Sequence, residues 1–76
     1  APWCGPCVAM APHFERAAQQ LKGRVLFAKV NSDKNPLLSR RFAIRSIPTL
    51  VRLDAGREVA RQAGALQLGQ IVSFAV

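Results

Sequence analysis

The stretch Trp3-Cys4-Gly5-Pro6-Cys7 decides what fold and chemistry to expect of this chain, because it holds both cysteines just ahead of a helical pattern. Two cysteines at this spacing can close a small disulfide ring or present two thiols one turn apart at a helix N-terminus. Unbonded N–H groups and the summed peptide dipoles favour a thiolate at that end of a helix. Pro6 suits the first helical turn, because its missing N–H would have no partner there. Since the thiolate attacks disulfides, the stretch indicates redox chemistry.

Two other interpretations of the cysteine pair are weaker. A Cys-x-x-Cys pair can form half of a zinc site, which needs two further ligands. His13 is the only histidine and there is no second cysteine pair, so zinc binding is disfavoured. An inert structural disulfide is disfavoured as well, because so short a loop constrains little of the unfolded chain. A redox-active dithiol is the favoured interpretation.

Composition and charge narrow the class of protein. The 76 residues, half of them apolar, suffice for one domain with a small core. The net charge of +7 comes from 11 Lys and Arg against 4 Asp and Glu, and no basic cluster is interleaved with stacking aromatics. We therefore expect no nucleic-acid partner; a solvated basic surface is favoured over a preference for acidic partners. No apolar run could span a bilayer and no basic-then-apolar leader is visible, so no membrane partner is expected. A lone Cys-x-x-Cys pair suggests a reducing compartment, the cytoplasm.

The residues behind the cysteines predict an amphipathic helix from Gly5 to about Leu21, with Gly23 as its C-cap. Pro12 falls inside the pattern and should kink the helix by removing one hydrogen bond. His13 follows on the side expected to be exposed, as a surface histidine and not a catalytic base. The apolar face is made of Cys7, Met10, Ala11, Phe14, Ala17, Ala18 and Leu21.

Residues 24–30 come next and predict a strand buried on both faces, because they are mostly apolar and rich in strand formers. Lys29 is the exception, and its structural interpretation is a lysine snorkelling from a strand end. Asn35-Pro36 then starts a short helix that runs to Phe42.

The last third of the chain predicts a hairpin and a final helix. Strands at 50–53 and 57–61 flank the turn Asp54-Ala55-Gly56. Gly64 predicts a bulge or a close backbone approach. Residues 67–76 form an amphipathic helix, whose inward positions are Leu68, Ile71, Val72 and Ala75.

The intact Trp-Cys-Gly-Pro-Cys motif resembles the active site of the thioredoxin family. Residues 45–50, Arg-Ser-Ile-Pro-Thr-Leu, look like the family segment in which a cis proline packs against the dithiol. The residues alone predict that Pro48 is an ordinary trans proline in a turn, at the start of a strand or at an edge. The resemblance implies instead that the Ile47–Pro48 bond is cis. The implied fold is an α/β, thioredoxin-like single domain over residues 1–76, incomplete because the strand, helix and central strand ahead of the active site are missing.

The resemblance also implies a function, that of a protein dithiol–disulfide oxidoreductase. Cys4 would be the nucleophile and Cys7 the resolving thiol. Lys29 matches a lysine that supports proton transfer beside a buried aspartate, which lies in the missing part. No cofactor or metal would be bound, and a thioredoxin reductase would restore the dithiol with electrons from NADPH. The substrate, a protein disulfide, would be held by Trp3, Gly5, Pro6, Ile47, Pro48 and Gly64.

Two rival functions come from other classes. A thioredoxin fold can serve as a binding module without turnover, but the intact Cys-Gly-Pro-Cys argues against this. An oxidase or isomerase of an oxidising compartment is the other rival. The Gly-Pro between the cysteines, and the lack of a visible export signal, favour the reductase.

Two further expectations concern accessibility. Cys4 should be the more exposed and more acidic thiol and Cys7 largely buried, because the second cysteine lies a turn further in on the apolar face. Without the family's central strand, an edge of residues 24–30 and apolar faces of the helices and hairpin would be open. The 76 residues alone are therefore expected not to form a stable, active reductase and to be prone to associate.

Overall fold

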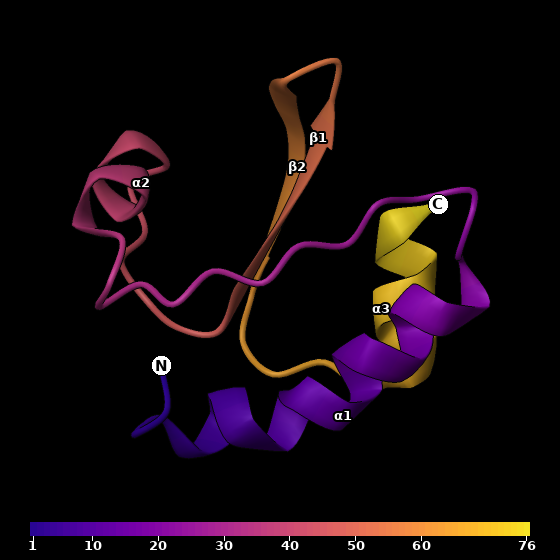
Figure 1. Cartoon of the computed structure of the whole chain (residues 1–76), viewed down its shortest axis with the longest axis horizontal. Helices are drawn as coiled ribbons and strands as arrows, with labels where there is room; N and C mark the ends of the chain where they lie inside the picture. The colour runs from indigo at the N-terminus through magenta and orange to yellow at the C-terminus, as the bar shows by residue number, and fades with distance from the viewer.

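The computed structural model describes residues 1–76 and contains three helices and one two-stranded sheet (Figure 1). In chain order these are α1 (Gly5–Gln20), α2 (Pro36–Arg41), β1 (Thr49–Asp54), β2 (Arg57–Ala63) and α3 (Leu68–Ala75). The observed helices agree with the predicted ones to within a residue or two at each end. None of them is long and apolar enough to cross a membrane.

The core lies where α1 and α3 pack side by side (Figure 1). Met10 and Ala17 of α1 meet Ile71 of α3, and all three side chains are buried. Phe14 packs edge-on against Phe27, with 5.1 Å between ring centroids. This packing confirms the apolar faces that the sequence predicts for both helices.

The hairpin of β1 and β2 is antiparallel, and Asp54 pairs with Arg57 at its tip. Ala55 and Gly56 form a two-residue turn in which both φ angles are positive, 52° and 79°. This backbone twist matches that of the flanking strands, which is why such turns close hairpins and favour glycine. The register shifts after Arg52, so the bulge of the hairpin falls within β2 and not at the predicted Gly64.

Arg61 of β2 ties the hairpin to the C-terminal end of α2. Its guanidinium donates hydrogen bonds to the carbonyl oxygens of Phe42 and Ala43 and forms an ion pair with Glu58 at 2.8 Å. The hydrogen bond from Arg61 holds the pKa of Glu58 below its ordinary value and, in return, raises the pKa of Arg61. A side chain exposed to solvent thus organises the junction between α2 and β2.

The predicted strand at residues 24–30 is the main correction to the fold. The segment forms no ladder with another strand and crosses from α1 towards α2 as an irregular chain (Figure 1). Its residues are half-buried or exposed, and Leu26 is 96% exposed. An apolar run can supply strand-forming side chains, but a strand also needs a partner to bond its backbone.

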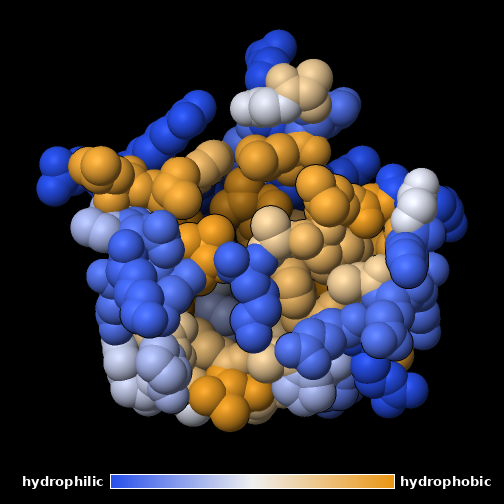
Figure 2. Space-filling view, in the orientation of Figure 1, coloured by the Kyte–Doolittle hydropathy of each residue, from blue (hydrophilic) through white to orange (hydrophobic).

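A hollow lies beside this segment, and we call it the apolar trough. It has a volume of about 960 Å³, and 21 of its 29 lining residues are hydrophobic, including Phe27, Leu50 and Phe74. Figure 2 shows hydrophobic residues gathered across the middle of this face of the molecule, between hydrophilic margins. The open apolar faces that the resemblance implies are therefore present.

Two smaller expectations also need correction. Gly23 is not the C-cap of α1, because the helix ends at Gln20 with Leu21 as its cap. Gly23 instead takes the positive φ of 86° in the turn that follows. His13 is half-buried and not on an exposed side, because α3 and the loop before it cover that part of α1.

Candidate functional site

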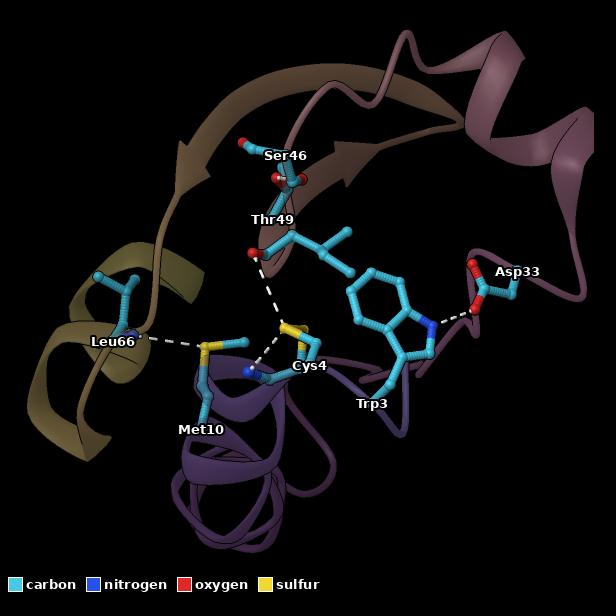
Figure 3. The surroundings of a disulfide bond; sticks show 9 residues. Trp3, Cys4, Met10, Asp33, Ser46, Thr49 and Leu66 are labelled. Atoms are coloured by element: carbon cyan, nitrogen blue, oxygen red, sulfur yellow. Dashed lines mark hydrogen bonds between the residues drawn. A yellow bond between two sulfur atoms is a disulfide. The ribbon is translucent and has the colours of Figure 1, made fainter.

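The two cysteines form a disulfide at the N-terminus of α1, with their Cα atoms 5.2 Å apart (Figure 3). Cys4 is the N-cap residue and has an extended backbone, so its side chain can turn back over the first turn. The backbone N–H of Cys7 donates to Cys4 Sγ at 3.2 Å. A free N–H of the helix start therefore points at the sulfur of Cys4, as stabilisation of a thiolate requires.

The segment before β1 covers the disulfide. The carbonyl oxygen of Ile47 lies 4.0 Å from Cys4 Sγ, and the Ile47–Pro48 peptide bond is cis. Pro48 is buried, and its carbonyl oxygen accepts a hydrogen bond of 2.8 Å from the N–H of Gly64. Gly64 has a φ of 97°, a conformation that favours glycine. The structure thus places the Ile47 carbonyl beside Cys4 and joins Gly64 to Pro48, the residue that follows Ile47.

The accessibility expected of the two cysteines is wrong for the disulfide form. Cys4 is 6% exposed, whereas Cys7 is half-buried and lines the apolar trough. Cys4 lies under Ile47, while Cys7 opens towards the apolar trough. Position along a helix says which face a thiol occupies, but what lies over that face determines its burial.

Trp3 lies beside the disulfide and is mostly exposed. Its indole N–H donates to a carboxylate oxygen of Asp33, so the ring is held against the loop that leads to α2 (Figure 3). Asn31 stabilises that loop by accepting hydrogen bonds from the backbone of Asp33 and Lys34. Asp33 was not among the predicted site residues, because its only signal in the sequence is its place in a polar loop between two apolar stretches.

Behind the disulfide, two contacts fix the loop between Gly64 and α3. The N–H of Leu66 lies 3.4 Å from Met10 Sδ, and the N–H of Leu68 donates to His13 Nδ1 at 3.3 Å. Leu68 opens α3, so His13 accepts from one of the N–H groups that a helix leaves unbonded at its start. His13 is therefore a structural acceptor for α3.

The remaining predicted residues lie around this centre. Gly5 and Pro6 are exposed in the first turn of α1. Lys29 is exposed. It lines the apolar trough, and so does the half-buried Cys7. No group of three or more His, Cys, Asp or Glu side chains is placed to hold a metal ion.

Comparison with known proteins supports a single family. The family model described as Thioredoxin matches residues 1–76. The chain is 43% identical over 74 residues to the thioredoxin of Haemophilus influenzae, covering 97% of this chain and 69% of that protein. It is 54% identical over 67 residues to thioredoxin C-3 of Corynebacterium nephridii, covering 88% of this chain but 46% of that protein.

Solved structures agree with this result. The thioredoxin of Fasciola hepatica superposes with a TM-score of 0.89 at 35% identity, over 100% of this chain and 74% of that one. The germline-specific thioredoxin Deadhead of Drosophila gives a TM-score of 0.90 at 32% identity, over 97% of this chain and 70% of that one. The chain therefore shares the arrangement of these proteins over nearly all of its own length, while spanning 46% to 74% of theirs.

Proposed function

The chain belongs to the thioredoxin family, and we propose that it reduces disulfide bonds of other proteins through Cys4 and Cys7. One observation carries the proposal: the two sulfurs are bonded at the start of a helix, where a backbone N–H points at Cys4. A thiolate at this place gains from the N–H and from the helix dipole, so the pair can cycle between dithiol and disulfide.

The reaction takes two exchanges. The Cys4 thiolate attacks one sulfur of the substrate disulfide, so that bond breaks, a mixed disulfide forms and the departing substrate thiolate takes up a proton from water. The Cys7 thiolate then attacks Cys4 Sγ, which breaks the mixed disulfide and releases the second substrate thiolate. The substrate gains two electrons and two protons, and the Cys4–Cys7 disulfide forms. Lys29, which lines the apolar trough as Cys7 does, is proposed to support proton transfer.

Substrate binding is assigned to the rim around Cys4. Trp3, Gly5 and Pro6 are exposed on one side of the disulfide, and Ile47, Pro48 and Gly64 approach from the other. An extended substrate segment would lie between the two groups with its disulfide over Cys4. The chain supplies the thiols itself and requires no bound cofactor.

The cellular setting is part of the same proposal. A thioredoxin reductase that draws electrons from NADPH would return the pair to the dithiol, and the reducing cytoplasm would be the compartment. Residues 1–76, which one family model matches throughout, would act as one thioredoxin-like domain. Neither nucleic acid nor membrane is among the proposed partners.

The test is reduction of insulin by dithiothreitol in the presence of the protein. We expect the folded wild-type protein to accelerate the reaction and Cys4→Ser to lose the acceleration, because no attacking thiol remains. Cys7→Ser should lose multiple turnover yet still react once with a disulfide. A wild-type chain that folds but gives no acceleration would favour the rival function, a binding module without turnover.

A further inference from the structure

Four of the eleven Lys and Arg residues of the chain lie close together in one segment. Residues 34–45 contain four cationic side chains and no anionic one, and we call them the basic segment. All four cations are exposed, and α2 forms the middle of the segment. They are Lys34, Arg40, Arg41 and Arg45.

Both ends of the basic segment are attached to the disulfide site. At one end, Lys34 follows Asp33, which accepts the hydrogen bond of the Trp3 indole. At the other end, Arg45 is two residues before Ile47, whose carbonyl oxygen faces Cys4 Sγ. Two residues span at most about 7 Å, so Arg45 starts close to the rim on which a substrate would lie.

The acidic residues of the chain compensate only part of this charge. Asp33 is the one carboxylate beside the segment and keeps its negative charge while it accepts from the Trp3 indole, and Glu58 is paired with Arg61. Glu15 lies in α1 and Asp54 at the tip of the hairpin. The N-terminus of α1 adds its own partial positive charge next to Cys4. A disulfide approaching Cys4 therefore meets a positive field from the helix end and from the basic segment.

From this placement we propose that the preferred substrates are disulfides flanked by acidic residues, which the basic segment contacts through Lys34 and Arg45. This inference rests on the proposed reductase function and names its substrate class. Exposed charges act mainly by raising the rate of encounter and by rejecting partners of like charge. Their effect is screened by salt over about 10 Å at 0.1 M ionic strength.

The test compares three synthetic peptides with the same intramolecular disulfide, flanked by two Glu, two Gln or two Lys residues. At low salt we expect kcat/KM to be about threefold to tenfold higher for the Glu peptide than for the Gln peptide, and lower still for the Lys peptide. At 0.5 M salt the three values should converge.

Variants assign the effect to the basic segment. Lys34→Gln combined with Arg45→Gln should remove most of the preference for the Glu peptide and leave the Gln peptide unchanged. Arg16→Gln combined with Lys22→Gln is the matched control, since it removes the same charge from the far half of α1 and beyond, about 16 Å or more along the axis from Cys4. That control should keep the preference.

The outcomes separate this inference from the proposed function. If the wild-type chain reduces all three peptides equally at low salt, the acidic preference is wrong and the reductase function stands. An equal loss of preference in both double variants would mean that net charge, and not the basic segment, is responsible. If no peptide is reduced, the proposed function itself fails.

Discussion

Similar aliphatic side chains are buried at the contact between α1 and α3 but exposed in the apolar trough. Ile71 is 1% exposed between the two helices, whereas Leu26 in the trough is 96% exposed. Both are aliphatic residues in apolar stretches. The difference lies in what packs on them: α3 has α1 as its neighbour, and residues 24–30 have no ladder partner. Burial, and with it stability, is a property of pairs of surfaces.

The same contrast separates the two cysteines. Cys4 lies on the closed side, under Ile47, and Cys7 opens towards the trough. Whatever packs against the trough would therefore change access to Cys7 more than access to Cys4. The chemistry of the site is set at the helix start, but its exposure depends on the rest of the molecule.

The largest effect on stability is expected for the two residues that differ most in exposure, Ile71 and Leu26. Ile71→Ala should lower the free energy of unfolding by about 2 to 5 kcal/mol, because it leaves a cavity between α1 and α3. Leu26→Ala is the matched control and should change it by less than about 0.5 kcal/mol, because its side chain is already in water. Denaturant unfolding of both variants measures the difference.

Equal losses in these two variants would contradict the open trough. Such a result would mean that Leu26 is buried in solution, either within the chain or against a second copy. Sedimentation of the wild-type chain separates these cases, because only association depends on concentration.

A smaller effect is expected at His13, on the closed side. His13→Leu removes the acceptor of the Leu68 N–H and should cost about 1 kcal/mol of unfolding free energy. His13→Asn keeps an acceptor near the place of Nδ1 and should cost less. Amide exchange at Leu68 gives the local readout, and faster exchange is expected only in the leucine variant. Equal exchange in both would show that the contact does not hold α3.

The smallest effect on stability is expected from the ion pair between Glu58 and Arg61 on β2. The bond from Arg61 lowers the pKa of Glu58, so its stabilisation is present above the unfolded-state pKa and is lost as the pH falls through the folded-state pKa. An NMR titration of the Glu58 carboxyl should give a midpoint below its ordinary 4.5, and Arg61→Gln should raise it. An unchanged midpoint would remove Arg61 as the cause.

Much of the fold could be predicted because its signals are local. The helical spacing behind Cys7, the Ala55-Gly56 turn and the amphipathic last helix each act over a few residues. The strand at 24–30 could not be settled this way, because a ladder needs a partner far along the chain.

The candidate site divides in the same way. The sequence motif located Cys4 and Cys7 at the start of a helix. The burial of Cys4 and the roles of Asp33 and His13 depend on segments that meet only in the folded chain. Each of these contacts joins residues at least 30 positions apart, beyond the reach of periodicity and turn signals.

The most direct test of the central claim, that Cys4 attacks and Cys7 resolves, is to trap the mixed disulfide. Cys7→Ser and Cys4→Ser are each incubated with a disulfide-containing protein, quenched with acid and analysed by mass spectrometry with peptide mapping. We predict a covalent adduct on Cys4 in the Cys7→Ser variant and little or none in the Cys4→Ser variant. An adduct that forms on Cys7 in Cys4→Ser, and none on Cys4 in Cys7→Ser, would contradict the assignment.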